Sequence, residues 1–235
     1  MQISDSQIDT PRSKPYLHEY TMVPGLHKFL IDSLPTSITH SSQVLDIGAG
    51  AGAWIERLGN SGFHNLYGID KDVQRFQATK GQFIAADLDY QDSILPDQTF
   101  DLITSIEVIE HLENPGRLFY HVSKLLAPNG YLLLTTPNLH SVICRLRLLL
   151  TGNLRQFDAK GEPTHIYPVF LTPLKRLLDL HGLEIVETWT FPETTTATSR
   201  PAFKLLSSVV TLFIHDELPG DILCLLIRKK SDSHG

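Results

Sequence analysis

Apolar and polar positions follow a regular order from Gln43 onward, with short apolar runs separated by helical patterns. This order is typical of parallel strands joined by crossover helices. The apolar runs predict strands at 43–48, 65–70, 81–86, 100–106, 131–136, 183–189 and 221–228. The helical patterns fall at 53–58, 72–80, 115–126, 173–181 and 202–214. The expected fold class is α/β, a Rossmann-like, seven-stranded, mostly parallel sheet with helices on both faces.

Three further segments lie outside this pattern. Residues 15–34 are helical in pattern but are interrupted at Pro24 and Gly25, which predicts two short helices that form an N-terminal lid. Residues 141–168 form a long insertion after the fifth predicted strand, on the expected acceptor side. Residues 1–14 mix Asp, Ser, Gln and Pro and are expected to be a flexible leader. A chain of 235 residues then predicts a single domain over 15–235.

Composition narrows the class of protein. A net charge of −6 gives no support to a protein that coats nucleic acid, so a nucleic-acid partner is not expected. The two cysteines, Cys144 and Cys224, lack the spacing of a zinc site or a disulfide framework, which predicts a cytoplasmic setting. The apolar stretches at 142–154 and 203–214 are shorter than the roughly 20 residues that span a bilayer.

Residues 44–52, VLDIGAGAG, end the first predicted strand and run into a glycine-rich turn. Glycines permit positive φ angles and let a ligand approach the backbone, although such a turn can also serve only to tighten a strand-to-helix connection. Gly48, Gly50 and Ala53 satisfy the dinucleotide-binding pattern as well. Asp46 distinguishes the two ligands, because its carboxylate would repel a pyrophosphate and attract an ammonium or a sulfonium. The turn therefore favours S-adenosylmethionine.

Two further acids end predicted strands. Asp70 closes the second strand beside the turn, where it can accept both hydroxyls of a ribose; its alternative role is to cap a helix from Asp72 onward. Asp87 follows the third strand in a position to accept from an adenine amine, with Leu88 against the ring. Asp89 is the competing acid for this role.

These motifs resemble those of class I S-adenosylmethionine-dependent methyltransferases, which carry an acidic-x-G-x-G-x-G turn, an acidic ribose contact and a later acid at the adenine. The resemblance spans residues 44–137 without a gap. It implies a sheet whose last strand runs antiparallel to the others, with the ligand at the carboxyl ends of the strands. It implies that the donor is bound by Asp46, Gly48, Ala49, Gly50, Asp70, Lys71, Asp87, Leu88 and Ile106. In that family pattern, Asp46 and Gly48 would hold the methionine end and Ile106 would pack near the sulfonium.

Glu107, Glu110 and His111 follow the fourth strand with i, i+3, i+4 spacing, which places them on one face of a helical turn. With residues 135–138 (TTPN) and His165, this run resembles a subset that contains quinone-biosynthesis O-methyltransferases and small-RNA 2′-O-methyltransferases. That resemblance implies that Glu107, Glu110, His111 and His165 bind Mg²⁺ or Mn²⁺. The alternative is a hydrogen-bonded floor without a metal, in which His111 is the general base.

Arg145, Arg147 and Arg155 are interleaved with leucines in the insertion. A basic amphipathic helix can lie in a membrane interface, so residues 142–155 predict peripheral membrane contact and an anionic or lipid-like acceptor. The alternative is a helix whose apolar face covers the core.

The function predicted from these features is O-methylation of a small-molecule hydroxyl. In-line positioning of an activated donor supplies most of the acceleration in methyl transfer, so no catalytic acid is required. RNA 2′-O-methylation is the alternative, but residues 163–167 lack the Arg- and His-rich run expected of that group. A catalytically silent regulatory subunit that binds S-adenosylmethionine is a second alternative, which the intact set of acids and glycines argues against.

Overall fold

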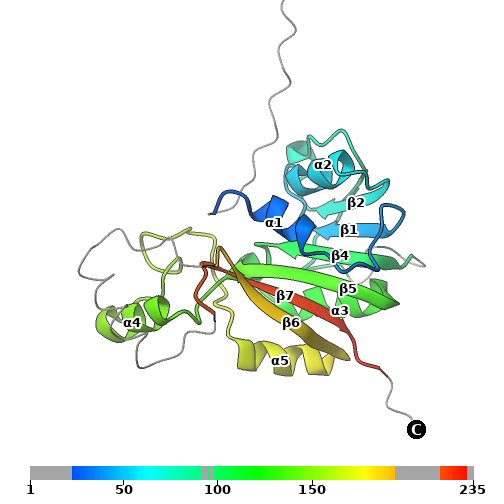
Figure 1. The fold of residues 1–235 in the computed structure, drawn as a ribbon. Coiled ribbons are helices and arrows are strands. Elements are labelled where there is room, and N and C mark those ends of the chain that lie inside the picture. The colour runs from blue at the N-terminus through cyan, green and yellow to red at the C-terminus, as the bar shows by residue number, and fades with distance from the viewer. Residues whose placement is uncertain (1–22, 92–94, 96–97, 194–217, 232–235) are drawn as a thin grey trace, which may run out of the picture.

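The structure, a computed structural model, describes residues 23–91, 95, 98–193 and 218–231. Seven strands in these ranges form one sheet (Figure 1). They are β1 (Gln43–Ile47), β2 (Asn65–Asp70), β3 (Gln82–Ala85), β4 (Phe100–Ile106), β5 (Leu126–Pro137), β6 (Leu183–Phe191) and β7 (Ile222–Lys229). Their order is β3-β2-β1-β4-β5-β7-β6, and β7 runs antiparallel to both of its neighbours while the other pairs are parallel. The predicted fold class is confirmed, including the antiparallel last strand.

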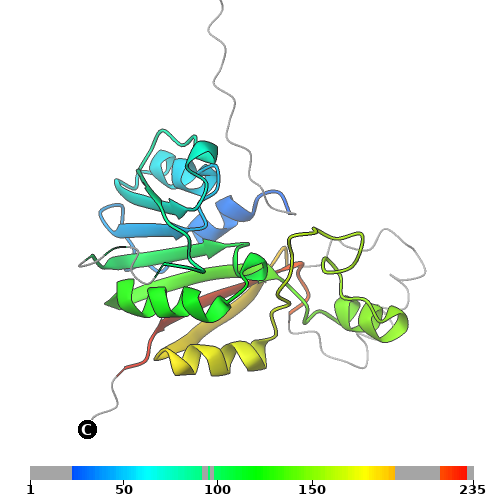
Figure 2. The same ribbon diagram turned by 180° about the vertical axis from the view of Figure 1, so that it is seen from behind.

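Helices cover both faces of this sheet. The described α-helices are α1 (Leu26–Asp32), α2 (Ala53–Asn60), α3 (Pro115–Leu125), α4 (Val142–Thr151) and α5 (Leu171–Leu180). Helices α1 and α2 pack on one face, and α3 and α5 pack on the other (Figure 2). Helix α4 follows β5 and lies beyond the carboxyl edge of the sheet, clear of both faces (Figure 1). The site described below forms at this edge.

Strand β1 is buried from both sides between Val44 and Ile47, as is usual for a central strand of a parallel sheet. Val44 belongs to the apolar cluster under α1 and α2, whereas Leu45 and Ile47 belong to the cluster under α3 and α5. Burial of each side chain contributes about 1.5–3 kcal/mol to stability. The strand is therefore anchored on both faces, and the glycine turn that follows it has a fixed position.

The helix predicted at 72–80 is wrong, because only a 3₁₀ turn at Val73–Arg75 forms there. Tertiary hydrogen bonds take the backbone groups that a helix would use. Thr79 N donates to Glu56 Oε2 at 2.7 Å, so the segment is tied to α2. Local propensity is overridden by this contact.

Several predicted boundaries move, and some predicted segments lie outside the described residues. Strand β5 begins at Leu126, earlier than predicted, because α3 ends at Leu125 and the chain pairs with β4 at once. The leader at 1–14, the helix at 202–214 and residues 15–22 of the predicted lid are outside the described ranges. From the lid, α1 is described and begins after Gly25, which has a φ of 92°. No described helix is long and apolar enough to cross a membrane.

Candidate active site

A cavity of about 1260 Å³ lies at the carboxyl ends of the first four strands. All the residues predicted to bind the donor line it, namely Asp46, Gly48, Ala49, Gly50, Asp70, Lys71, Asp87, Leu88 and Ile106. They come from separate segments of the chain. The fold brings them together because the carboxyl ends of neighbouring parallel strands meet at one edge of the sheet.

The turn after β1 requires glycine at two positions for different reasons. Gly48 has a φ of +78°, and a Cβ there would lie 2.5 Å from Cγ2 of Val108. Gly50 has a φ of +52° with nothing within 4 Å of its Cβ position, so only the backbone conformation favours glycine. The amides of Gly48 and Ala49 donate to Ile69 O at 2.8 and 2.9 Å. These hydrogen bonds tie the turn to β2.

The Asp70 carboxylate is oriented by backbone amides at the cavity wall. Its Oδ2 accepts from Gly50 N at 2.8 Å, and its Oδ1 accepts from Asp72 N at 3.0 Å. The cap of the following 3₁₀ turn is Asp72, whose Oδ1 accepts from Gln74 N at 3.1 Å, and not Asp70. Asp70 is therefore held beside the glycine turn as a hydrogen-bond acceptor.

Asp87 and Asp89 both line the cavity after β3 but have different partners. Asp87 Oδ1 accepts from Asp89 N at 3.0 Å, which is a local turn. Asp89 Oδ1 accepts from Asn114 N at 3.2 Å and so ties this loop to the start of α3. Each of the two acids thus accepts one backbone hydrogen bond, and the adenine contact of Asp87 stays a prediction.

Asp46 is buried in the cavity floor, with 3 % of its surface exposed. Thr104, its partner in the β1–β4 pairing, donates to Asp46 Oδ1 at 2.7 Å, and Trp54 Nε1 donates to Thr104 Oγ1 at 3.0 Å. Burial raises the pKa of Asp46 to about 7, against the lowering effect of the Thr104 hydrogen bond, and Asp70 adds to the rise. Neither Thr104 nor Trp54 is among the predicted site residues; a hydroxyl within an apolar strand is the signal that could have found Thr104.

The acidic turn after β4 does not have the predicted helical geometry. Glu107 has a φ of 54° and precedes the 3₁₀ turn Ile109–His111, so the i, i+3, i+4 face does not form. Thr135 Oγ1 donates to Glu107 Oε1 at 3.1 Å, and Thr136 Oγ1 donates to Glu110 Oε2 at 3.0 Å. The two carboxylates are thus bound by consecutive residues of β5, whose side chains point to opposite faces of the sheet.

Glu110 is fully buried in this turn, and Glu107 is partly buried in the cavity wall. Burial raises the pKa of Glu107 to about 7, and the Thr135 hydrogen bond opposes that rise. Burial and the neighbouring Glu107 raise the pKa of Glu110. Glu110 Oε1 has no hydrogen-bond partner within the described part of the chain. A buried oxygen without a hydrogen-bond partner destabilises the folded state unless it is protonated or binds a ligand or an ion.

His165, which the insertion supplies, lies against Glu110 and His111. The two imidazole centroids are 4.7 Å apart, and the ligand atoms of Glu110, His111 and His165 lie within 4.8 Å of one another. His111 Nδ1 donates to Thr164 O at 3.1 Å, so its Nε2 is left as an acceptor. Burial lowers the pKa of both imidazoles. The structure therefore groups three of the four predicted metal ligands, and Glu107 is outside that group.

Gln156 is a cavity residue that the sequence pattern does not reveal. It has a φ of 71°, unusual for a residue with a side chain, and it is buried. A Cβ at Gly161 would lie 2.3 Å from Gln156 O, which explains why a glycine stands opposite it. Sparsely populated backbone conformations cluster at functional sites, and this one lies in the cavity wall.

Helix α4 has a buried end and an exposed end. Val142, Ile143 and Cys144 are buried, whereas Leu149 is 79 % exposed and Leu150 is 60 % exposed. Of the two alternatives for this helix, the one in which it covers the core fits its first turn, and the one in which it contacts a membrane concerns its last turn. The first turn covers the core, and the last turn leaves leucines in solvent.

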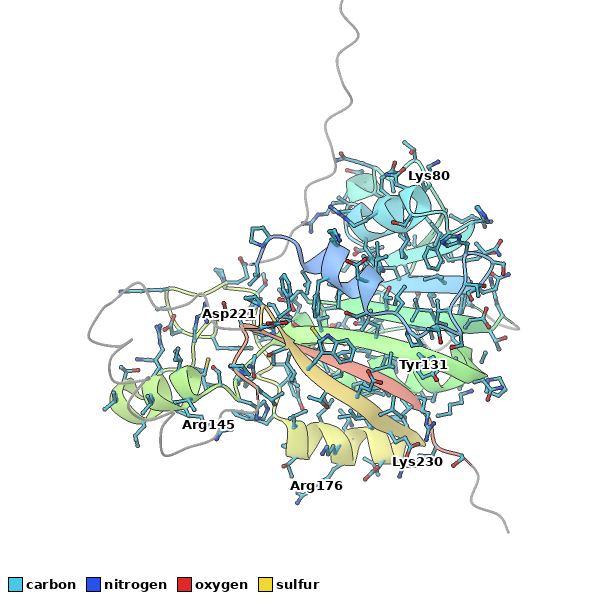
Figure 3. All side chains as sticks on the ribbon, in the orientation of Figure 1. Lys80, Tyr131, Arg145, Arg176, Asp221 and Lys230 are labelled. Carbon is cyan, nitrogen blue, oxygen red and sulfur yellow. The ribbon has the colours of Figure 1, made fainter. Side chains whose placement is uncertain are left out.

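Acidic partners hold two of the arginines of the insertion. Arg155 Nη1 lies 2.7 Å from Asp221 Oδ1, and Arg147 forms an ion pair with Asp158. Both arginines line the cavity. Arg145 lies on α4 away from the sheet, whereas Asp221 lies where β7 begins (Figure 3). The ion pair of Arg155 thus anchors the insertion to the carboxyl edge of the sheet.

Comparison with known proteins identifies the family of this chain. A family model described as a methyltransferase domain matches residues 18–188, more than half of the chain. The chain belongs to this family. Ubiquinone biosynthesis O-methyltransferase from Rhodopseudomonas palustris is 29% identical over 186 residues, which cover 75% of this chain and 71% of that protein. The protein of the same name from Neisseria meningitidis is 27% identical over 157 residues, which cover 62% of this chain and 65% of that protein.

Solved structures show the same fold. A SAM-dependent methyltransferase from Archaeoglobus fulgidus superposes with a TM-score of 0.61 at 22% identity, covering 87% of this chain and 93% of that one. The methyltransferase family and the seven-stranded topology together make this enzyme a class I S-adenosylmethionine-dependent methyltransferase. The resemblance given by the glycine turn and the acids at the strand ends is confirmed.

Proposed function

We propose that the enzyme transfers a methyl group to a hydroxyl of a small molecule. The observation that carries this proposal is the grouping of Glu110, His111 and His165, with both imidazoles in the wall of the cavity that contains the donor-binding turn. A hydroxyl that attacks a methyl group must lose its proton, and a neutral imidazole can accept it. Relatives named ubiquinone biosynthesis O-methyltransferase support an oxygen acceptor.

The donor half of the cavity fits S-adenosylmethionine by charge and by hydrogen bonding. In this proposal Asp46 receives the ammonium group and Asp70 receives the ribose hydroxyls. Asp87 and Leu88 hold the adenine, and Ile106 packs near the sulfonium. S-adenosylmethionine supplies an already activated methyl group, so the task of the chain is to orient the two reactants.

His111 is the general base in the proposed reaction. The hydrogen bond from its Nδ1 to Thr164 O, at 3.1 Å, fixes the tautomer in which Nε2 accepts a proton. Because burial lowers the pKa of His111, the imidazole is neutral and able to act near pH 7. The Glu110 carboxylate lies close enough to stabilise the imidazolium that forms.

A divalent cation is a second arrangement that the same side chains fit. Glu110 Oε1 is buried without a hydrogen-bond partner among the described residues, and it lies in the group with His111 and His165. Mg²⁺ or Mn²⁺ bound there would lower the pKa of the acceptor hydroxyl. A carboxylate and two imidazoles would leave coordination positions for acceptor oxygens.

The exposed end of α4 favours a lipid-like acceptor. Leu148, Leu149 and Leu150 are exposed, and Arg145 is exposed beside them. Apolar and basic side chains on one short helix are typical of helices that lie in a membrane interface. We propose that this turn rests on a bilayer and that the acceptor enters the cavity from there.

The experiment that tests the proposed reaction supplies the enzyme with methyl-labelled S-adenosylmethionine and a panel of acceptors. The panel contains phenols, catechols, aliphatic alcohols and a short RNA, and nuclear magnetic resonance identifies the methylated atom. We expect a methyl ether on a small hydroxyl compound. Methylation of the RNA, transfer to nitrogen, carbon or sulfur, or donor binding with no transfer to any acceptor would each contradict the proposal.

A further inference from the structure

A buried chain of hydrogen bonds connects helix α2 to the cavity floor. Trp54 Nε1 donates to Thr104 Oγ1 at 3.0 Å, and Thr104 Oγ1 donates to Asp46 Oδ1 at 2.7 Å. Trp54, Thr104 and Asp46 are all at most 3 % exposed. Trp54 and Asp46 also line the cavity, so this series of hydrogen bonds begins and ends at the cavity wall.

The chemistry of the three groups fixes which of them donates in each hydrogen bond. An indole N–H can only donate, and a hydroxyl carries a single proton with two acceptor positions. Trp54 occupies an acceptor position of Thr104, so the hydroxyl proton is free to point at Asp46. Leu45 O is a further acceptor for that proton at 3.5 Å, the outer limit of a hydrogen bond. The indole therefore keeps Thr104 acting as a donor toward the carboxylate.

Burial and nearby acids oppose the negative charge of Asp46. Asp70 at the end of β2 and Glu107 after β4 line the same cavity, and both are acids. Cationic side chains also line the cavity, among them Lys71 and Arg155, and the His27 ring on α1 lies 5.2 Å from that of Trp54. A neighbour that only donates stabilises the ionised carboxylate, whereas a freely rotating hydroxyl could also accept from the protonated acid.

We propose that Trp54 is a positioning residue for the methyl donor, acting through Thr104 to keep Asp46 ionised and aimed at the donor's ammonium group. This inference rests on the assignment of that group to Asp46 in the proposed function. A purely apolar role would be filled as well by a phenylalanine in the same space. The difference between the two side chains is the single N–H that reaches Thr104.

The test compares two ligands by calorimetry, S-adenosylhomocysteine and 5′-methylthioadenosine. Both carry the adenosine and the sulfur, but the second lacks the amino-acid end. Thr104→Val and Trp54→Phe are expected to weaken S-adenosylhomocysteine about tenfold and to leave 5′-methylthioadenosine within about twofold of wild type. Thr104→Ser keeps the hydroxyl and is expected to bind both ligands like wild type.

Two further variants make the result decisive. Trp189→Phe changes the other tryptophan, on β6, and is expected to bind both ligands normally. Asp46→Asn removes the carboxylate, and its loss of S-adenosylhomocysteine affinity is the reference for a site without ammonium recognition. The informative quantity is the affinity for S-adenosylhomocysteine relative to that for 5′-methylthioadenosine. If Asp46→Asn lowers this ratio and Thr104→Val or Trp54→Phe does not, the positioning role is overturned while the assignment of the ammonium group to Asp46 stands. If Asp46→Asn also leaves the ratio unchanged, the ammonium assignment is overturned with it. Equal weakening of both ligands by Thr104→Val would reduce Trp54 and Thr104 to a packing role.

Discussion

The two ends of the cavity, to which we assign the donor and the acceptor, are built in different ways. At the donor end the acids stand at strand ends, and backbone amides orient them, as Gly50 N does for Asp70. At the acceptor end Glu110 and His111 belong to a short 3₁₀ turn, and the insertion supplies His165. Strand ends keep their shape when a side chain is changed, whereas a group held by loops depends on each member. Donor binding and hydroxyl chemistry should therefore be separable by mutation.

The largest expected effect is at the acceptor end. Glu110→Gln replaces the carboxyl group that lies beside the two imidazoles, so turnover with a hydroxyl acceptor should fall about 100-fold or more while S-adenosylhomocysteine affinity is kept. Turnover is measured with saturating donor, and affinity by calorimetry. Glu113→Gln, an exposed acid in the following loop, is the matched control and should behave like wild type.

Removal of divalent cations separates the two acceptor-end mechanisms. If a cation activates the hydroxyl, a chelator should reduce wild-type turnover as strongly as Glu110→Gln does and have little further effect on that variant. If His111 acts without a cation, chelation should leave wild-type turnover intact. A loss of donor affinity in Glu110→Gln that parallels the loss of turnover would argue against the separation of the two ends.

The next effect is at the donor end and acts on the fold. Gly48→Ala places a Cβ against Val108 and forces a side chain into positive φ, which should lower the free energy of unfolding by about 2–4 kcal/mol. Gly50→Ala meets no neighbour and should cost only about 1–2 kcal/mol. Urea unfolding midpoints measure both values. Equal losses in the two variants would show that Val108 can move aside.

The two ends also differ in how far the sequence predicts them. The glycine turn and Asp70 are predictable because strand ends meet at one edge whatever lies further along the chain. The group of Glu110, His111 and His165 is predicted only in part, because the spacing in the sequence also placed Glu107 with them on a helical face. In the structure, Glu107 is instead bound by Thr135, which lies on a strand far along the chain. The Thr104 contact to Asp46 depends on the register of β1 against β4, which local pattern does not fix.

A smaller effect is expected from pH. The pKa of Asp46 is about 7 before the donor binds, and the ionised form is the one that attracts an ammonium. Donor affinity should therefore be lost as pH falls through about 7, by up to about tenfold per unit, and should level off above it. Calorimetry from pH 5.5 to 8.5 measures this profile. Asp46→Asn should flatten it; an unchanged profile in that variant would assign the titration to another group.

The smallest effect is expected at the exposed last turn of α4, for which we propose membrane contact. Leu149→Asp should weaken binding to anionic phospholipid vesicles roughly fivefold, because a charged side chain replaces one that would enter the interface. Leu180→Asp is the control, since Leu180 is 80 % exposed but lies on α5. Vesicle sedimentation measures both variants. Similar binding by the two variants, or no binding by wild type, would remove α4 as a membrane contact.

The most direct test of the two-ended site measures donor affinity and turnover in the same preparations of Asp70→Ala and His111→Ala. Asp70→Ala should weaken S-adenosylhomocysteine by about 1.5–3 kcal/mol, through the lost charge-assisted hydrogen bonds, and retain turnover when the donor is saturating. His111→Ala should retain donor affinity and lose about 100-fold or more in turnover. This crossed pattern is the result we predict. Variants that lose affinity and turnover together, or Asp70→Ala with unchanged donor affinity, would contradict it.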